Sequence, residues 1–407
     1  MTMDVTKILE LQEWLIAGGL DGVDESALMR GTCERLQAAG MQLWRGVVAA
    51  EYLHPTIEGH FFEWRRLRAD VDGREFDRDE QADRSEEWLQ SPYYHLHQVK
   101  ERRLRRRLGD GTHRPGQFPV IDKLMGEGAT DYLAYVIPFT DSARTSDTDA
   151  LYSSWSTDRP EGFTEDEIAI LDRIVPTLAL VLRNRSMAKT ATNVLSVYLG
   201  NDAGARVLGG QIERGKTEKI RAVLWYSDLA GFTRIVDSAP YEQIVPLLND
   251  YADCQVNAIH GRGGQVLKFM GDGLLAIFRG DSDADACHLA LEAADDAFRR
   301  LGDVNRDRTE KALPTTRFYL GLHLGTVLYG NIGTQERLDF TVVGQAVNEA
   351  SRIQALCKSV DRNVILSAGF ARAATRSSNR LVSLGRYALR GVRQAQELFT
   401  LDEYAPS

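Results

Sequence analysis

Cysteine is scarce in this sequence and follows no ligand or disulfide pattern. The 407 residues include four cysteines, none of them in a CxxC pair or a Cys/His zinc motif: Cys33, Cys254, Cys287 and Cys357. A disulfide-rich secreted domain and a structural zinc site are therefore excluded. We expect four free and mostly buried thiols.

Long apolar runs are also absent. The longest, residues 174–182, spans nine residues and is interrupted by Pro176 and Thr177, whereas a membrane helix needs about 20. Asp4 and Glu10 lie where a signal peptide would need a basic start and then an apolar run. The sequence thus predicts a soluble, cytoplasmic protein without a membrane partner.

Basic residues do not outnumber acidic ones. Lys and Arg total 49 and Asp and Glu total 58, a formal net charge of −9, which argues against nucleic acid as a partner. A binding site for a polyanionic ligand must then be formed by a local cluster of positive charges. The arginine-rich segment 102–107 is expected to form a solvated helix face or an interdomain contact.

Apolar residues are abundant enough for two or three domains. The chain is 43% hydrophobic and 26% charged, as in typical globular proteins, and a domain averages about 150 residues. Residues 1–110 are expected to be rich in helix, with a first strand near 44–50. Aromatic and β-branched residues at 131–139 and 150–157 predict an antiparallel strand pair.

Two histidines, His95 and His97, stand two residues apart. If they lie on a strand they share one face and could ligate a metal or haem. No third ligand is marked, so ordinary half-exposed histidines are the favoured interpretation.

The start of a long helix is marked at residues 163–168. Thr164 can cap the helix and Glu167 can reach back to it, while Phe163 and Ile168 can form a hydrophobic staple. A helix with an apolar stripe suited to packing is expected from about Glu165.

The later part of this helix leads out of the N-terminal region. Pro176 is expected to kink the helix or to end its first part. Over about residues 120–185, the strand pair, the cap and the helix resemble the end of a GAF-type sensor domain, which implies an α/β regulatory domain with an unknown small-molecule ligand. Residues 186–215 carry too many large apolar side chains for a flexible linker and predict a helical connector.

The chemistry-bearing part begins with a buried strand at 220–226 that runs into a glycine-containing turn. Asp228 stands at the end of the strand, and a helix is expected soon after Gly231. A carboxylate in this place can bind a metal ion beside backbone N–H groups that hold phosphate.

A second segment, residues 265–278, predicts two strands joined by a tight turn at Gly271-Asp272-Gly273. In an isolated hairpin Asp272 would only support the turn. Since it follows Asp228 by about 44 residues, with a helix between, the hairpin can pair beside the first strand. Both carboxylates would then project to one edge, as a two-Mg²⁺ phosphoryl-transfer site requires.

A third segment, residues 338–352, predicts a strand that enters a helix. Asn348 and Arg352 are four residues apart and share one helix face. An amide there could orient a ribose, and a guanidinium could neutralise a phosphate.

Taken in order, the three segments resemble the class III adenylate and guanylate cyclases over about residues 218–403. The resemblance implies an α+β, ferredoxin-like βαββαβ catalytic domain at 216–407, after a GAF-like regulatory domain with N-terminal helices (1–185) and the connector (186–215). It also implies two Mg²⁺ or Mn²⁺ ions per active site, and a homodimer whose sites take residues from both chains.

The resemblance also assigns roles at the metal and phosphate sites. Asp228 and Asp272 would bind the metal ions, with a backbone carbonyl from Leu229. The backbone of the next turn would cradle the phosphates: Ala230, Gly231, Phe232 and Thr233.

Further implied roles concern the nucleotide. Lys268 and Thr341 would read the purine. Asn348 would position the ribose, and Arg352 would stabilise charge at the α-phosphate. Arg390, within residues 387–392, stands where the family has a phosphate-binding lysine.

These roles predict a regulated adenylate cyclase that converts ATP to 3′,5′-cyclic AMP and pyrophosphate. Lys268 suits adenine N1, an acceptor, whereas a glutamate would be expected for guanine. Because Thr341 takes a position that is aspartate in many adenylate cyclases, guanylate cyclase stays an alternative. An inactive cyclase-like module for nucleotide binding or dimerisation is the other.

Overall fold

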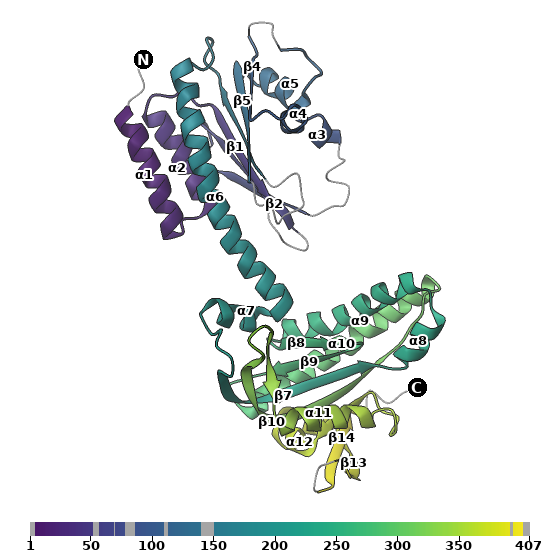
Figure 1. Cartoon of the computed structure of the whole chain (residues 1–407). Coiled ribbons are helices and arrows are strands. Elements are labelled where there is room, and N and C mark those ends of the chain that lie inside the picture. Colours follow the sequence, from purple (N-terminus) through teal and green to yellow (C-terminus); the bar gives the residue numbers. More distant parts are fainter. Residues whose placement is uncertain are drawn as a thin grey trace. The chain divides into compact units, whose positions relative to one another are not determined.

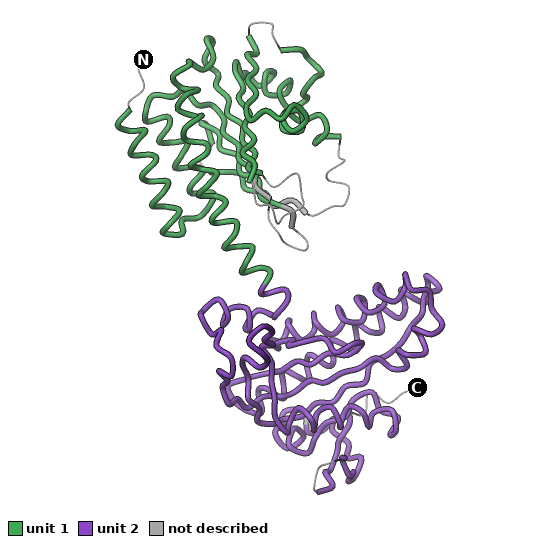
Figure 2. The backbone as a smooth tube through the Cα atoms, viewed as in Figure 1, with its two compact units in different colours: residues 1–194 green, residues 195–407 purple. Residues whose placement is uncertain are grey.

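The computed structural model describes residues 5–51, 57–68, 70–77, 86–109, 113–139, 150–390 and 394–401. The chain divides into two compact units, residues 1–194 and 195–407, which Figure 2 shows in green and purple. Among the helices of the described residues, none has the length and apolar character needed to cross a membrane.

The N-terminal unit is built on a six-stranded antiparallel sheet, in the order β3-β2-β1-β6-β5-β4. Its strands are β1 Arg45–Glu51, β2 Ile57–Arg65, β3 Asp72–Asp77, β4 Arg103–Arg107, β5 Asp131–Pro138 and β6 Ala150–Thr157. Its helices are α1 Val5–Asp21, α2 Glu25–Ala38, α3 Glu86–Leu89, α4 Pro92–Val99, α5 Pro119–Gly126 and α6 Glu165–Leu199, the last residues of which belong to the second unit.

Helices cover both faces of this sheet (Figure 1). α1, α2 and α6 pack on one face around the buried Leu133 and Trp155. α4 and α5 pack on the other face around Tyr132 and Tyr152. Neighbouring residues of one strand thus serve two separate cores, because side chains alternate across a sheet.

The expected helix start and strand pair are both confirmed. Thr164 Oγ1 accepts from the Glu167 N–H at 3.2 Å, and a Glu167 carboxylate oxygen accepts from the Thr164 N–H at 2.8 Å. α6 begins at Glu165 and continues through Pro176 without ending there. β5 and β6 pair from Asp131 to Pro138 as expected.

One expectation for this unit was wrong, and the favoured interpretation of His95 and His97 as ordinary half-exposed histidines is confirmed. Residues 103–107 form the edge strand β4 and not a helix face. His95 and His97 lie on helix α4, where residues two apart point to different faces at about 100° per residue, so they do not form a ligand pair. His97 Nε2 instead lies 2.9 Å from the Tyr152 hydroxyl.

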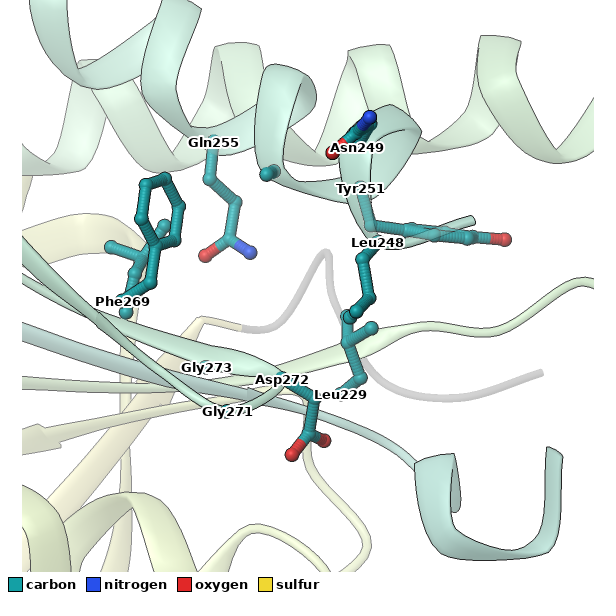
Figure 3. A pocket seen from close by; sticks show the side chains of 11 residues that line it. Leu229, Leu248, Asn249, Tyr251, Gln255, Phe269, Gly271, Asp272 and Gly273 are labelled. Atoms are coloured by element: carbon teal, nitrogen blue, oxygen red, sulfur yellow. The ribbon is translucent and has the colours of Figure 1, made fainter. Parts of the chain in front are cut away.

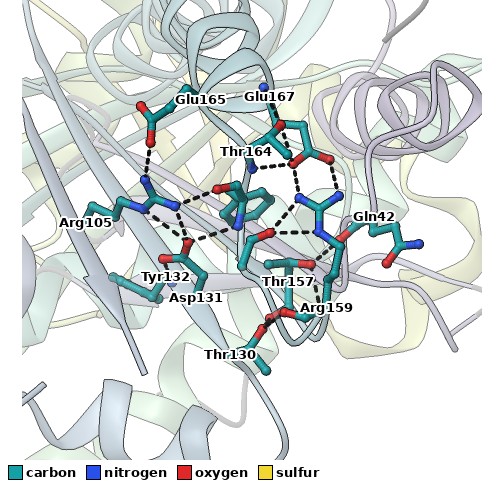
Figure 4. A network of polar contacts seen from close by, with 12 residues as sticks. Gln42, Arg105, Thr130, Asp131, Tyr132, Thr157, Arg159, Thr164, Glu165 and Glu167 are labelled. Carbon is teal, nitrogen blue, oxygen red and sulfur yellow. Dashed lines mark hydrogen bonds and ion pairs between the residues drawn. The ribbon is translucent and has the colours of Figure 1, made fainter. Parts of the chain in front are cut away.

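Arg105 of β4 takes part in a network of polar contacts (Figure 4). Arg105 donates to the fully buried Asp131 at 2.8 and 3.1 Å and to the Phe163 carbonyl at 2.6 Å. The Phe163 N–H also donates to Asp131, at 3.0 Å. The run therefore ties the edge strand to the segment that leads into α6.

The second unit is built on an eight-stranded sheet, in the order β13-β14-β12-β10-β7-β9-β8, with β11 paired to β10. Its strands are β7 Thr217–Leu229, β8 Gln265–Met270, β9 Gly273–Phe278, β10 Phe318–Gly333, β11 Leu338–Val343, β12 Val364–Ser367, β13 Leu381–Tyr387 and β14 Gln396–Leu401. Its helices are α7 Asn201–Leu208, α8 Phe232–Ser238, α9 Tyr241–Gly261, α10 Asp283–Glu310, α11 Gln345–Leu356, α12 Ala368–Ala373 and a 3₁₀ helix, Thr375–Arg380.

The centre of this unit has the expected βαββαβ order, β7-α9-β8-β9-α10-β10, with the strands arranged β10-β7-β9-β8. α9 and α10 cover one face and α11 covers the other (Figure 1). Glycines let α11 lie close to the sheet: a Cβ at Gly325 would be 2.4 Å from the Ala346 Cβ. The protein is thus α+β. The ends of the strands in its second unit carry the candidate active site.

Candidate active site

Asp228 lies at the end of β7, between β10 and β9. Its side chain is half-buried. The chain turns at Gly231, whose φ of +69° glycine adopts without strain, and then enters α8. The strand and the turn fix the backbone on both sides of this carboxylate.

Asp272 lies in the tight turn between β8 and β9, after Gly271 with a φ of +68°. The next residue, Gly273, passes so close to β7 that a Cβ there would be 2.1 Å from the Ser227 carbonyl oxygen. Only glycine permits this approach, and it brings the turn beside the end of β7.

The two carboxyl groups meet as the sequence predicted. The pKa of Asp228 is raised to about 7. Burial is the largest cause, and a hydrogen bond to Asp272 and the negative charge of Asp272 add to it. Two carboxylates in contact resist joint ionisation, and a nearby cation relieves that cost. This edge of the sheet can therefore hold a cation.

A small cavity of about 210 Å³ lies on the α9 side of this turn. In Figure 3, Gln255 and Tyr251 of α9 lie above the strands, whereas the Asp272 carboxylate points away from them. Asp272 is thus part of the cavity lining, but its carboxylate does not point toward the α9 side chains.

Lys268 and Thr341 come together at a second, larger cavity. They come from β8 and β11, and both line a space of about 570 Å³. Lys268 is exposed, whereas Thr341 is 4% exposed and its hydroxyl has no hydrogen-bond partner among the described residues. The cavity offers a cationic donor and an unused hydroxyl to a ligand that enters it, with the Phe269 and Phe340 rings in its lining.

Asn348 and Arg352 share one face of α11, as expected from their spacing. Asn348 is exposed and Arg352 is half-buried. Neither lines the Lys268 cavity or the cavity beside Asp272. One chain therefore places the predicted residues in three groups: the carboxylate pair, the Lys268 cavity and the α11 face.

The βαββαβ core and the segments that carry these three groups lie within a region that matches a known family. The family model described as the adenylate and guanylate cyclase catalytic domain matches residues 216–403. Residues 216–403 are a class III nucleotidyl cyclase catalytic domain. The family match does not include the antiparallel-sheet domain of the N-terminal unit, whose family is unassigned.

Similar proteins include cyclases of both nucleotide classes. An adenylate cyclase of Anabaena cylindrica is 33% identical over 162 residues, which are 40% of this chain and 32% of that protein. The adenylyl cyclase CyaB of P. aeruginosa has a TM-score of 0.42 and 20% identity, covering 46% of this chain and 95% of that one. The guanylyl cyclase Cya2 has a TM-score of 0.41 and 27% identity, covering 46% and 93%.

The curated relatives are longer than this chain. The aligned region spans about a third of the Anabaena protein and 42% of a 30% identical uncharacterised protein of Mycobacterium tuberculosis.

Cyclase domains of this family generally use two divalent metal ions. The described residues hold no group of three or more His, Cys, Asp or Glu side chains that could enclose a metal ion. Mg²⁺ needs no such cage, because it is commonly held by one or two carboxylates together with water and substrate phosphates. The Asp228 and Asp272 pair, with its unfavourable like charges, fits this kind of binding.

The turn expected to hold phosphates is only partly free to do so. The Ala230 N–H donates to the Arg317 carbonyl at 2.7 Å, so it does not point to a ligand. Gly231, Phe232 and Thr233 open α8, where the first N–H groups of a helix have no partner within the helix. Among the four residues of the predicted turn, Ala230 is therefore the one whose N–H is already bonded to the protein.

Arg390 is exposed and follows Leu389, which is buried in a small cluster beside β12 and β14. Gly391 and Val392, the end of the segment compared with the family, lie outside the described residues. The buried leucine fixes the backbone from which Arg390 extends.

One supporting element was not foreseen from the sequence. The Tyr251 hydroxyl accepts from the Thr316 N–H at 2.8 Å and donates to Asn305, and the Thr316 hydroxyl donates to the Ala230 carbonyl at 2.6 Å. This chain holds the turn after Asp228 from the α9 side. The spacing of apolar residues places Tyr251 on the apolar side of a helix but does not reveal the partner of its hydroxyl.

Proposed function

We propose that this chain is an adenylate cyclase that forms 3′,5′-cyclic AMP and pyrophosphate from ATP. The contact between Asp228 and Asp272, inside a domain that matches the cyclase family, carries the proposal. Like charges in contact raise the free energy of the empty site, and binding of a metal-bound triphosphate would offset that cost.

Two divalent metal ions, when bound by Asp228, Asp272 and the Leu229 carbonyl, would activate the ribose 3′-hydroxyl and neutralise the triphosphate. Gly231, Phe232 and Thr233 would hold phosphate oxygens through their N–H groups. We assign the leaving pyrophosphate to Arg390, whose charge replaces that of a lysine.

Lys268 and Thr341 would bind the adenine. The Lys268 ammonium can donate to adenine N1, and the unpartnered Thr341 hydroxyl can accept from the exocyclic amine. Their common cavity is large enough for a purine.

Asn348 and Arg352 would act at the ribose and the α-phosphate of a site shared with a second chain. They would act there with Lys268 and Thr341 of the same chain, opposite the metal ligands of the other chain. The absence of Asn348 and Arg352 from the cavity beside Asp272 in their own chain supports this arrangement. Leu328 of β10 and Val343 of β11 face each other in register and are 44% and 39% exposed, an apolar pair suited to an interface between two copies.

The N-terminal unit would regulate the cyclase as a GAF-like domain, with a small molecule as its ligand. Its separate core and its antiparallel sheet under helices on both faces support an independent regulatory domain. We propose domain limits of 1–185, 186–215 and 216–407, and a cytoplasmic location.

Nucleotide turnover tests the proposal directly. Purified full-length chain with Mg²⁺ or Mn²⁺ should convert ATP to cyclic AMP faster than GTP to cyclic GMP, measured by product chromatography. Faster GTP turnover would favour a guanylate cyclase, and turnover of neither nucleotide would favour an inactive module. In Lys268→Glu, the loss of the donor to adenine N1 should lower ATP turnover by about 10-fold or more, since a missing charged hydrogen bond costs about 1.5–3 kcal/mol.

A mixture of two inactive chains tests the shared site. Asp228→Ala and Asn348→Ala chains should each be inactive, but a heterodimer of the two should regain activity through one intact site. A confirmed heterodimer without activity would disprove the shared arrangement and leave the nucleotide assignment standing.

A further inference from the structure

A cavity of about 540 Å³ lies in the N-terminal unit and is lined by residues of that unit. Its floor is the sheet face that α4 and α5 cover, with Arg45, Val47, Phe61, Tyr132 and Ser154 in the lining. Small-molecule sites usually have about 300–1,000 Å³. The space is therefore right for one small organic ligand.

Arg45 gives the floor unused hydrogen-bond donors. The residue is 7% exposed, its Nε donates to Glu63 at 2.8 Å, and one Nη donates to the Ser154 hydroxyl at 3.4 Å. The other Nη makes no hydrogen bond with the described residues. A guanidinium fork with free N–H groups is matched best by a carboxylate or a similar planar pair of oxygens.

Tyrosine hydroxyls lie next to this guanidinium. Tyr93 and Tyr132 interact with Ser154 and with each other, and burial raises the pKa of both. They remain protonated at neutral pH and can donate to an oxygen acceptor. The floor thus gathers donors around one position.

The charges near the cavity set the charge of the ligand. Glu63 accepts from both Arg45 and Arg65, and Arg65 also pairs with Glu127 at 2.7 Å, so the charges of these two arginines and two glutamates balance. The exposed Lys123 adds one positive charge to the lining. This charge favours an acidic group on the ligand.

The rest of the lining includes apolar side chains and two acidic side chains. Val47, Phe61 and Val120 offer surface to a ring or an alkyl group, while Glu86 and Glu87 are exposed on α3 beside the same space. These glutamates oppose a polyanion such as a nucleoside triphosphate.

We propose that this cavity binds a small, ring-containing monocarboxylic acid, with its carboxylate on Arg45 and the tyrosine hydroxyls and its ring against Val47 and Phe61. The ligand is the signal for the regulatory role proposed above, but the binding itself does not depend on that role or on cyclase activity.

Ligand-observed NMR on the full-length chain tests the binding without any turnover. The probes are benzoate, cinnamate, indole-3-acetate and cyclohexanecarboxylate, each measured beside its primary amide. At least one acid should bind, and its amide should bind at least about 10-fold more weakly, since a charged hydrogen bond contributes about 1.5–3 kcal/mol. Absence of binding by all four acids, or equal binding of acid and amide, would overturn the proposal.

Two variants of α5 locate the site. Val120 and Met125 are each 38% exposed, but only Val120 lines the cavity. Val120→Trp should block binding of the acid and Met125→Trp should leave it unchanged. Unchanged binding in Val120→Trp would place the acid elsewhere and overturn the proposal. Both side chains are at the surface, so neither substitution removes the buried ion pair between Arg45 and Glu63, and both variants should fold.

Discussion

Asp131 of the N-terminal unit and Asp228 of the cyclase domain contact partners whose charges have opposite signs. In the N-terminal unit, Asp131 is met by Arg105 and by the Phe163 N–H. In the cyclase domain, Asp228 is met by another carboxylate, Asp272. Opposite charges in contact neutralise each other within the protein, whereas like charges in contact need a cation from outside to neutralise them. The comparison separates residues that build the protein from residues that await a ligand.

The largest effect is expected from Asp228→Asn. The variant should lose cyclase activity by more than about 100-fold, because even groups that only support a metal ligand are worth about 10–100-fold. In EDTA the same variant should be more stable than the natural chain, since one of two repelling carboxylates is gone. Activity assays and thermal unfolding measure the two effects, and a variant that is active or less stable would break the comparison.

Asp131→Ala should have the opposite effect on stability: this variant should be less stable than the natural chain. The variant leaves Arg105 without its buried partner, and breaking such a pair costs about 3–5 kcal/mol of unfolding free energy. Denaturant unfolding followed by tryptophan fluorescence reports mainly on this unit, which holds five of the six tryptophans.

The matched control for Asp131→Ala is Glu165→Ala. Glu165 contacts the same Arg105 at 2.7 Å but is 82% exposed, so its removal should cost less than about 1 kcal/mol. If both variants lost the same stability, burial would not be what distinguishes the two carboxylates.

Gly273→Ala should separate the two carboxylates without removing either. A Cβ at Gly273 would meet the Ser227 carbonyl at 2.1 Å, so the turn must move away from β7. We expect a loss of activity of about 10–100-fold, by analogy with the cost of small misplacements in active sites.

The control for this change is Gly271→Ala in the same turn. A Cβ there meets nothing within 4 Å, and the φ of +68° costs about 1–2 kcal/mol of stability. Its activity should fall less than that of Gly273→Ala. An equal loss in both variants would point to the turn's stability and not to the distance between the carboxylates.

The smallest effect is expected from Tyr251→Phe. The ring stays buried, but the Thr316 N–H loses its acceptor, at a cost of about 1–3 kcal/mol of stability. Activity should fall only a few-fold, because Tyr251 acts through Thr316 and the Ala230 turn. If activity with saturating Mg²⁺ is unchanged, the chain of hydrogen bonds supports folding alone.

Local signals were predicted well from the sequence. The Thr164 and Glu167 cap and the Gly271-Asp272-Gly273 turn each lie within a few residues, so the chemistry that forms them is visible in the sequence. The convergence of Asp228 and Asp272 followed from two strand ends and the connection between them.

Distant partners account for the failures. The run at 102–107 suggested a solvated helix, but Arg105 has its partner Asp131 26 residues away, and this pairing holds it in a strand. The N–H of Ala230 is taken by Arg317, a residue on the far side of α9 and α10 in the sequence. The strand β13 and the Arg45 cavity likewise depend on contacts that spacing does not encode.

The four cysteines noted at the outset have a practical consequence. All are buried, and burial raises their thiol pKa values, to about 11 for Cys254 and to about 12 for Cys287 and Cys357. Thiolates react and thiols do not, so maleimide reagents should leave the natural chain unlabelled at neutral pH. A single cysteine introduced at the exposed Met125, on the same helix but outside the cavity lining, would therefore carry a fluorophore or spin label without background. A spectroscopist could observe ligand binding with no natural cysteine removed beforehand.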